Sequence, residues 1–326
     1  MTPTDKGGRS ARPTVLYLGG LGRSGTTLLE RMLAELPGVC SLGEVVHLWK
    51  RGLGDDERCG CGEPFSRCAF WTRVGDVAFG GWSEVDRNRV LHLQHAIDRT
   101  RRIPQLAVAP GDSALGRQCR EYADYYRRLY AAAAEVSGSP VVVDSSKNSS
   151  LAFCLRQPHT IDLRVLHMVR DSRGVAYSWT KRVLRPDREH DESFMTQYSP
   201  WSAALLWDAH NLSFDLLRRL GTPTLLVRYE ELLSAPRAGL TRIADFAGVP
   251  AGDGSLDFLT GTDATLHPTH TVSGNPMRFQ TGTISLRRDD DWRTMLPAGR
   301  RRLVSAVTMP LLLRYGYLHP AKRDGA

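Results

Sequence analysis

Residues 19–29 read GGLGRSGTTLL and connect two apolar segments of different periodicity. The segment before them, residues 15–18, is a short continuous apolar run, which is typical of a buried strand. The segment after them carries leucine and methionine at helical spacing as far as Leu36. A glycine-rich turn between a strand and a helix directs several backbone N–H groups at one point, and the helix dipole adds a positive field there. We therefore expect this turn to bind a phosphate group.

The turn differs from the P-loop of nucleotide triphosphatases in the two residues that follow its glycines. The spacing from Gly20 to Gly25 fits, but a P-loop continues with lysine and then serine or threonine, which reach the phosphates and Mg²⁺. Here the next residues are Thr26 and Thr27, and the cation is Arg23, inside the turn. The turn therefore suits phosphate binding but lacks the usual lysine for moving a γ-phosphoryl group.

The order of apolar segments along the chain predicts an α/β fold. Strand-like runs lie at residues 15–18, 141–143, 163–169 and 224–227, and helical patterns lie at 171–183, 201–220 and 237–247. Continuous apolar strands of this kind are covered on both faces in parallel sheets. We therefore predict a P-loop-like, doubly wound parallel sheet flanked by helices.

We predict a single domain over residues 14–320, between polar tails at 1–13 and 321–326. The pattern changes between residues 51 and 139, where two helix-like stretches follow a cysteine-rich loop. We interpret this part as a helical insertion after the first βα unit, either a lid that binds the acceptor or a cover with no role in specificity. Residues 253–293 show little periodicity, and loops of that length in a compact domain are functional or disordered.

Composition and charge exclude several classes of protein. The chain has a formal net charge of +8, which favours an anionic ligand. Its basic residues are scattered and do not alternate with aromatic ones, so we expect no nucleic-acid binding. No apolar run approaches the ~18 residues of a membrane helix, and residues 1–13 contain no apolar core of a signal peptide. We expect a cytoplasmic protein with no membrane span.

The cysteines should be mostly thiols in a reducing compartment. Three of them, Cys59, Cys61 and Cys68, lie close together and suggest zinc, with His47 or Cys119 as a fourth ligand. The spacing lacks the paired C-x2-C knuckles of common zinc sites, which favours packing of a glycine-rich loop instead.

Polar residues follow the ends of the other predicted strands, where ligands bind in open α/β sheets. Lys147 comes after the second strand, where serines and a cation replace the further carboxylates that a magnesium site would need. Arg170 closes the third strand, and Ser178 lies eight residues on, on the same helix face, so that the pair is suited to clamp a second phosphate. The acid nearest the turn is Glu44, which we regard as a candidate general base.

These elements resemble the sulfotransferases that use 3′-phosphoadenosine-5′-phosphosulfate (PAPS) as the donor. In that family, the turn matched by residues 22–27 binds the 5′-phosphosulfate, and an R-x7-S element, matched by Arg170 and Ser178, binds the 3′-phosphate. Tyr229 matches a tyrosine near the adenine, and Ser273 matches a serine that contacts the donor. Together with the polar segment 270–278, this places donor binding at Gly22, Arg23, Ser24, Gly25, Thr26, Thr27, Arg170, Ser178, Tyr229, Ser273, Asn275 and Arg278.

The resemblance is closer to the tyrosylprotein and carbohydrate sulfotransferases than to the cytosolic small-molecule enzymes, because the turn has arginine and no histidine neighbours Lys147. It implies in-line displacement at sulfur, with Glu44 as the base, His47 as the alternative base, and Arg23 and Lys147 stabilising the departing phosphate. The products are a sulfate ester and 3′,5′-ADP, and no metal is required.

Two other functions stay open at this point, a P-loop small-molecule kinase and an inactive nucleotide-binding scaffold. The expected acceptor is a hydroxyl of a small molecule, lipid or carbohydrate. Neither its identity nor the oligomeric state follows from the sequence.

Overall fold

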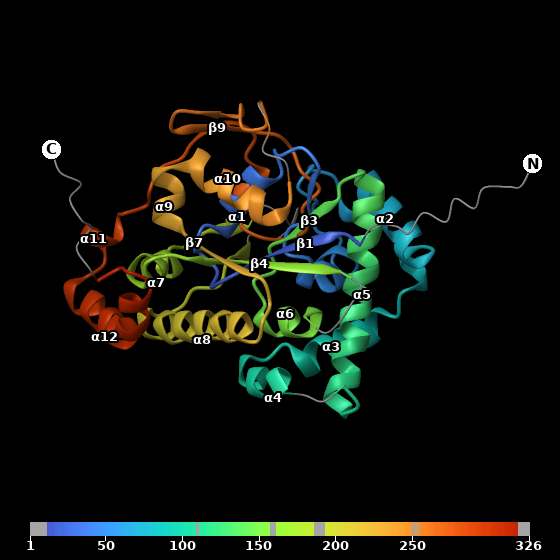
Figure 1. Ribbon diagram of the computed structural model, residues 1–326, viewed down its shortest axis with the longest axis horizontal. Coiled ribbons are helices and arrows are strands. Elements are labelled where there is room, and N and C mark those ends of the chain that lie inside the picture. The colour runs from blue at the N-terminus through green and yellow to red at the C-terminus, as the bar shows by residue number, and fades with distance from the viewer. Residues whose placement is uncertain are drawn as a thin grey trace, which may run out of the picture.

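A parallel sheet of five strands lies at the centre of the computed structural model, in the order β2-β3-β1-β4-β7 (Figure 1). Each neighbouring pair of strands is parallel. The strands are β1 (Thr14–Gly19), β2 (Val39–Ser41), β3 (Val141–Asp144), β4 (Asp162–Val169) and β7 (Thr224–Arg228). All four apolar runs that the sequence marks as strands belong to this sheet, and helices cover both of its faces. The predicted doubly wound α/β fold is therefore confirmed.

The structure describes residues 12–318 except for 109–110, 157–160, 186–192, 250–251 and 253. The predicted tails therefore lie outside the described residues, apart from Arg12 and Pro13. The extent of the single domain, residues 14–320, stays a prediction. In the described part of the chain, no helix combines the length and the apolar character needed to cross a membrane.

The helices lie on the two faces of the sheet or pack against helices that do. They are α1 (Thr26–Leu33), α2 (Ala69–Phe79), α3 (Arg87–Ile97), α4 (Ile103–Val108), α5 (Ala114–Ser137), α6 (Ser149–Leu155), α7 (Ser172–Thr180), α8 (Pro200–Arg219), α9 (Tyr229–Ser234), α10 (Pro236–Ala247), α11 (Trp292–Met295) and α12 (Ala298–Arg314). In Figure 1, α9 and α10 lie above the sheet, whereas α6 and α8 lie below it.

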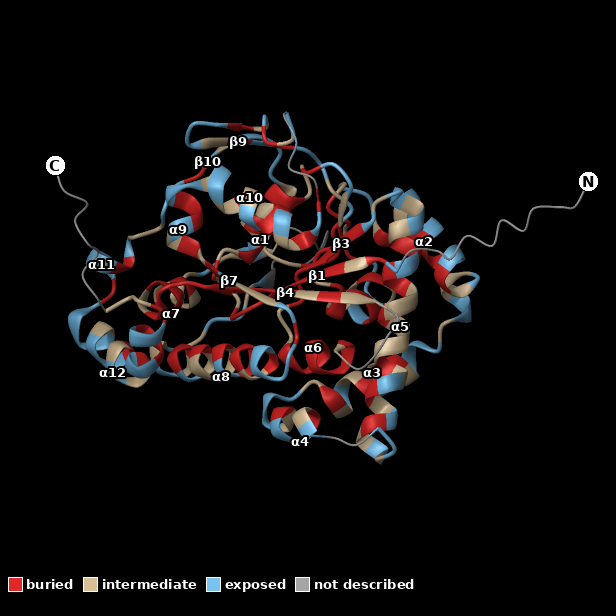
Figure 2. Cartoon of the chain, in the orientation of Figure 1, coloured by how far each residue is buried: buried red, intermediate tan, exposed pale blue. Residues whose placement is uncertain are grey.

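The core is divided by the sheet into two parts, because successive residues of a strand point to opposite faces. In β1, Val15 and Tyr17 pack in one cluster with residues of α5, α6 and α8. Leu16 and Leu18 pack in the other with residues of α1 and α10. Figure 2 shows the buried residues on the strands and on the helix faces turned toward them.

The predicted helices at residues 171–183, 201–220 and 237–247 correspond to α7, α8 and α10. Side-chain caps set the start of the first two, because Asp171 accepts a hydrogen bond from the Arg173 amide and Ser199 accepts one from the Ser202 amide. The helices α6, α9 and α11 escape sequence prediction because each spans seven residues or fewer, too short to show helical periodicity.

The helical insertion follows the first βα unit and the short strand β2, and comes before β3. Its longest helix, α5, is bonded to the end of β3, because the Tyr130 hydroxyl donates to Asp144 Oδ2 at 2.6 Å. The Trp49 Nε1 group donates to the Tyr126 hydroxyl at 2.9 Å, which ties the same helix to the segment after β2. The insertion thereby fixes the end of the strand that leads to Lys147.

The segment from 253 to 293, in which the sequence shows no periodicity, contains short strands. In this segment, β8 (Leu259–Thr260), β9 (Asp263–Leu266) and β10 (Gly282–Ser285) form a small antiparallel sheet. Earlier in the chain, β5 (Leu184–Arg185) and β6 (Ser193–Phe194) form a separate pair of strands. Strands of two to four residues are too short for an alternating pattern to identify them. The connection from β9 to β10 runs beside the end of β2, where Val272 pairs with Gly43.

Two of the six cysteines, Cys119 in α5 and Cys154 in α6, form a disulfide. The expectation of mostly free thiols holds for the remaining cysteines, which are Cys40, Cys59, Cys61 and Cys68.

Candidate active site

The turn after β1 has the backbone of an anion-binding cradle. Gly20, Arg23 and Gly25 all adopt positive φ angles, of 120°, 73° and 89°. A Cβ atom on Gly20 would lie 2.2 Å from the carbonyl oxygen of Met168, and one on Gly25 would lie 2.5 Å from the ring of Tyr229, so both positions require glycine. Gly25 caps α1 without a side-chain hydrogen bond among the described residues, which leaves the first amides of the helix available to a ligand.

A cavity of about 360 Å³ opens at this turn, at the carboxyl edge of the sheet. Residues that follow all five strands of the sheet contribute to its wall. The lining includes Gly22, Arg23, Gly25, Thr26, Thr27, Glu44, Lys147, Arg170, Ser178, Tyr229 and Asn275, which the sequence singles out, and also Leu28, Trp179, Met195, Met277 and Asp289. Parallel strands end at the same edge, which is why residues from such distant parts of the chain meet here.

Arg23 presents unsatisfied donors at this cavity. Its guanidinium lies 5.4 Å from the centre of the Trp179 ring, and Trp179 Nε1 donates to the Gly22 carbonyl at 3.1 Å. Two nitrogen atoms of Arg23, Nε and Nη2, and the Ser24 hydroxyl oxygen are buried, with no hydrogen-bond partner in the described chain. Burial also lowers the pKa of Arg23. Buried donors without partners are costly, so the arrangement favours an anion that accepts from them.

Glu44 and Lys147 form an ion pair in the same cavity. Lys147 Nζ lies 2.6 Å from Glu44 Oε1 and donates to the Ser145 carbonyl at 2.8 Å, while His47 Nε2 lies 3.5 Å from Glu44 Oε2. Burial alone would raise the pKa of Glu44, but the neighbouring Lys147 ammonium acts against burial, and the pKa of Glu44 is lowered on balance. Glu44 is therefore ionised at neutral pH, as a base must be.

His47 belongs to a second, adjoining cavity of about 530 Å³, whose wall also includes Lys147. Burial, followed by the nearby Arg51 cation, lowers the pKa of His47 to about 4, so its ring is neutral at pH 7. Residues of the insertion, among them Gln94 and His95 of α3, form the opposite wall. The two cavities thus share Lys147 in their walls.

Arg170 links the cradle to the segment that precedes α11. Its Nη1 donates to the Arg23 carbonyl at 3.1 Å, and its Nη2 donates to the Asp289 carbonyl at 2.8 Å. The guanidinium also lies 4.6 Å from the centre of the Tyr229 ring and 3.2 Å from Asp289 Oδ2. Ser178 lines the same cavity, as the spacing from Arg170 predicts.

Asp289 and Glu30 matter to this site, and the sequence motifs do not point to either. Asp289 lines the cavity and pairs with Arg170. Glu30 is 3% exposed, and its carboxylate accepts from the Ser41 hydroxyl at 2.6 Å, the Gly43 amide at 2.7 Å and the Ser145 hydroxyl at 2.6 Å.

Glu30 therefore joins α1 to the ends of β2 and β3, next to Glu44 and Lys147. Burial raises its pKa, although its hydrogen bonds act in the opposite direction. The sequence contains one sign of this role, an acidic residue among the apolar residues of α1. Apolar spacing identifies the helix but does not identify Glu30 as a functional residue.

Three of the residues expected to bind the donor do not line the cavity: Ser24, Ser273 and Arg278. Ser273 accepts a hydrogen bond from Arg51 Nη1 at 2.6 Å. Arg278 is 2% exposed and donates to the carbonyls of Thr271 and Arg58, each at 2.6 Å. It therefore joins residues 270–278 to the loop that contains Arg58. Asn275 and Met277 of the same segment do line the cavity.

The parallel sheet, the glycine turn and the absence of a P-loop lysine from that turn define an α/β protein of the P-loop-like class. The model of the sulfotransferase family matches residues 16–253, and the chain belongs to that family. It is therefore a transferase that moves sulfuryl groups.

Comparison with solved structures finds sulfotransferases that align over most of the chain. The sulfotransferase domain of the Synechococcus PCC 7002 olefin synthase is 23% identical, covers 94% of this chain and 96% of its own, and has a TM-score of 0.46. The sulfotransferase domain from the curacin biosynthetic pathway is 14% identical, and the alignment covers 92% of this chain and 97% of that domain, with a TM-score of 0.49. Sulfotransferase STF9 from Mycobacterium avium is 15% identical, and the alignment covers 97% of this chain and 79% of STF9, with a TM-score of 0.46. A comparison with curated protein sequences finds no significant match.

Proposed function

We propose that this sulfotransferase moves the sulfuryl group of PAPS to an acceptor hydroxyl and releases 3′,5′-ADP and a sulfate ester. The observation that carries the proposal is that two anion-binding sets, the cradle with Arg23 and the pair Arg170 and Ser178, line one cavity of about 360 Å³. A donor with phosphate groups at two ends requires such a pair of sets. Membership of the sulfotransferase family supports sulfuryl transfer over the alternative, a P-loop small-molecule kinase.

The donor is proposed to lie with its 5′-phosphosulfate at the cradle and its 3′-phosphate at Arg170 and Ser178. Tyr229 forms part of the same wall and is suited to contact the adenine ring. The carboxylate of Asp289 now lies against Arg170, so the 3′-phosphate has to share this guanidinium with it or displace it.

In the proposed reaction, Glu44 takes the proton of the acceptor hydroxyl as the oxygen attacks sulfur. The bond between sulfur and the bridging oxygen of the 5′-phosphate breaks, and the electron pair stays with the phosphate. Lys147, Arg23 and the backbone amides of the cradle stabilise this charge. The step needs no metal.

The acceptor is proposed to bind in the adjoining cavity of about 530 Å³, because Lys147 lines both cavities. That cavity presents His47, Lys50, Gln94 and His95, and most of the other residues that line it are also polar. This favours a polar small molecule or a carbohydrate over a lipid chain as acceptor. It also supports the interpretation of the insertion as a lid that binds the acceptor.

Binding of 3′,5′-ADP without added Mg²⁺ tests the donor. At a ligand concentration 100 times Kd, a site of this kind stabilises the folded protein by about 2.7 kcal/mol, which thermal unfolding detects as a rise in Tm. ATP with Mg²⁺ should give a smaller rise. If the order is reversed, the kinase alternative is the better one.

The substitution Arg170→Ala should weaken binding of 3′,5′-ADP much more than binding of 5′-AMP. Hydrogen bonds to a charged group contribute about 1.5–3 kcal/mol, which corresponds to roughly a 10- to 150-fold increase in Kd. Calorimetric titration of both nucleotides provides the measurement. Arg173→Ala is the matched control, because Arg173 pairs with Asp171 at 2.6 Å and does not line the cavity. Equal losses for the two nucleotides would contradict the assignment of Arg170 to the 3′-phosphate.

A further inference from the structure

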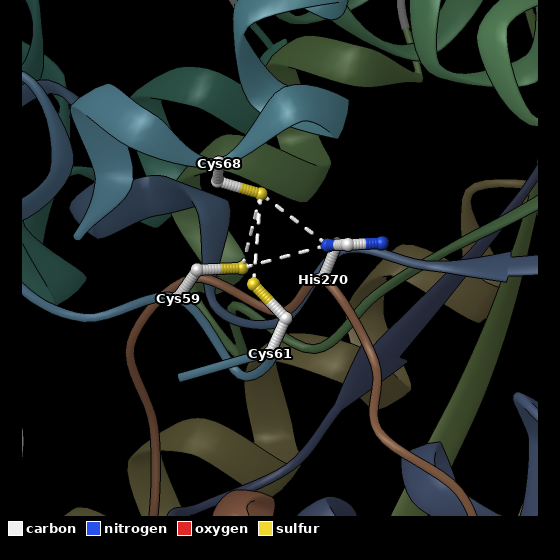
Figure 3. A group of neighbouring side chains, drawn as sticks. All are labelled: Cys59, Cys61, Cys68 and His270. Carbon is white, nitrogen blue, oxygen red and sulfur yellow. Dashed lines mark hydrogen bonds between the residues drawn. The ribbon is translucent and has the colours of Figure 1, made fainter. Parts of the chain in front are cut away.

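Four side chains that can ligate a metal meet beside the active site, as Figure 3 shows. Cys59, Cys61 and Cys68 come from the loop before α2, and His270 comes from the connection between β9 and β10. Their ligand atoms all lie within 4.8 Å of one another. Cys68 Sγ is 3.6 Å from Cys59 Sγ, 3.8 Å from Cys61 Sγ and 3.3 Å from His270 Nδ1, and Cys59 Sγ is 3.9 Å from the same nitrogen.

We propose that these four residues form a structural zinc site. Tetrahedral zinc has Zn–S bonds of about 2.3 Å and Zn–N bonds of about 2.0 Å, which places its ligand atoms roughly 3.5–3.8 Å apart. The four distances above lie around these values. Three thiolates and one imidazole complete the coordination sphere and leave no open position, which is the mark of a structural site rather than a catalytic one.

The convergence of the sulfur atoms distinguishes this arrangement from ordinary packing. Cysteines that fill an apolar loop direct their sulfur atoms at carbon neighbours. Here the sulfur atoms of Cys59, Cys61 and Cys68 point at one another and at a ring nitrogen, and none of the three forms a disulfide. The preference for packing that follows from the sequence spacing is therefore not supported.

The fourth ligand is also different from the two that the sequence suggests. His47 lies against Glu44 in the active site, and Cys119 is bonded to Cys154. His270 lies 202 residues after Cys68, so no local spacing could reveal it.

Surrounding groups hold the ligands in orientation, as around known metal sites. The Cys59 amide donates to the Glu63 carbonyl at 2.8 Å, and the Gly62 amide donates to the Cys59 carbonyl at 2.9 Å. These bonds fix the turn that carries Cys59 and Cys61.

The imidazole of His270 is fixed separately. The ring of Phe70 stacks on it at 5.0 Å with an angle of 12° between the planes, and Trp71 Nε1 donates to the His270 carbonyl at 2.9 Å. The close approach of the two segments also requires glycine at residue 60, because a Cβ there would lie 2.4 Å from the Thr271 hydroxyl.

The position of the site gives it a consequence for catalysis, and this part rests on the proposed function. The residues after His270 run along the end of β2, where the Glu44 amide donates to the Val272 carbonyl at 2.8 Å. Three residues further, Asn275 lines the donor cavity. Zinc would therefore anchor the segment that supports both the backbone of the proposed base and one wall of the donor site.

The metal content of the full-length chain tests the proposal directly. The protein is purified without a polyhistidine tag from medium containing zinc, and its metals are measured by plasma mass spectrometry. We expect one zinc per chain, lost in Cys68→Ser and in His270→Ala, and retained in His270→Cys, which provides a fourth thiolate. Cys40→Ser is the matched control and should keep its zinc, because Cys40 is a free thiol that does not belong to the cluster.

Replacement of zinc by Co²⁺ in the wild-type chain supplies a measurement that depends on no variant. The expected spectrum has the intense visible bands of tetrahedral cobalt and a sulfur-to-cobalt charge-transfer band, and its visible bands should shift in His270→Cys. Removal of the metal should lower Tm, and restoring zinc should recover it. A wild-type chain that takes up neither metal and melts at the same temperature with and without zinc would overturn the proposal. Because metal content is read without any sulfuryl transfer, the result is independent of whether PAPS is the donor.

Discussion

Replacing Lys147 by alanine should lower kcat by about 10²–10³-fold, the usual cost of removing one donor that stabilises charge in the transition state. Lys147 lines both cavities, and its ammonium group lies 2.6 Å from Glu44 Oε1. It is the cation closest to the proposed base. Binding of 3′,5′-ADP should change little, because Arg23, the cradle amides and Arg170 remain. Steady-state kinetics and nucleotide titration on the same preparations give the two quantities.

A loss of structure has to be separated from a loss of chemistry in this variant. Lys147 and Glu44 are 12% and 15% exposed, so alanine at 147 leaves a largely buried carboxylate without its partner and should lower Tm. Adding Glu44→Gln should recover part of that Tm without recovering kcat. Arg89→Ala is the control for removal of a positive charge, because Arg89 pairs with Glu121 at 2.6 Å on the outside of the insertion. Full turnover in Lys147→Ala would show that its proposed role is wrong.

Replacing Glu44 by glutamine should lower kcat by about 10²–10⁴-fold, the range typical of a general base, and leave the Kd of 3′,5′-ADP close to that of the wild type. Glutamine keeps the shape and the hydrogen-bonding capacity of the side chain but has no basic oxygen with which to accept the proton. The neighbouring Lys147 ammonium lowers the pKa of Glu44 against the effect of burial. The wild-type rate should therefore stay constant as pH falls toward ~4.3, the ordinary glutamate value, and decline only below it.

The alternative base is His47, and the pH profile does not separate the two because the pKa of His47 is also lowered, to about 4. The matched variant His47→Gln does separate them. If Glu44 is the base, His47→Gln should affect the acceptor KM more than kcat, since His47 lies in the wall of the adjoining cavity. A larger loss of kcat in His47→Gln than in Glu44→Gln would assign the base to His47.

Local sequence determined the sheet and the cradle. Each of the four predicted strands is a mainly apolar run, and the cradle is formed by consecutive residues whose backbone needs glycine at residues 20 and 25. The meeting of Arg23, Lys147 and Arg170 in one cavity also follows from the sequence, because each comes directly after a strand and parallel strands end at the same edge.

The short edge strand, the hairpins and the supporting residues could not be derived in this way. β2 has three residues and contains no pattern of its own, yet its pairing with β3 sets the position of Glu44. Glu30 appears in the sequence as one more residue of an amphipathic helix, and its role depends on the two strand ends that it joins.

The tertiary structure alone decided the contacts that Asp289 and His270 make with distant parts of the chain. Asp289 reaches Arg170 across 119 residues, and His270 reaches Cys68 across 202. Periodicity and motif spacing predict local structure, because they arise from the geometry of a single strand, turn or helix. A contact between remote segments depends instead on how whole elements pack against one another, and no short window of sequence contains that information.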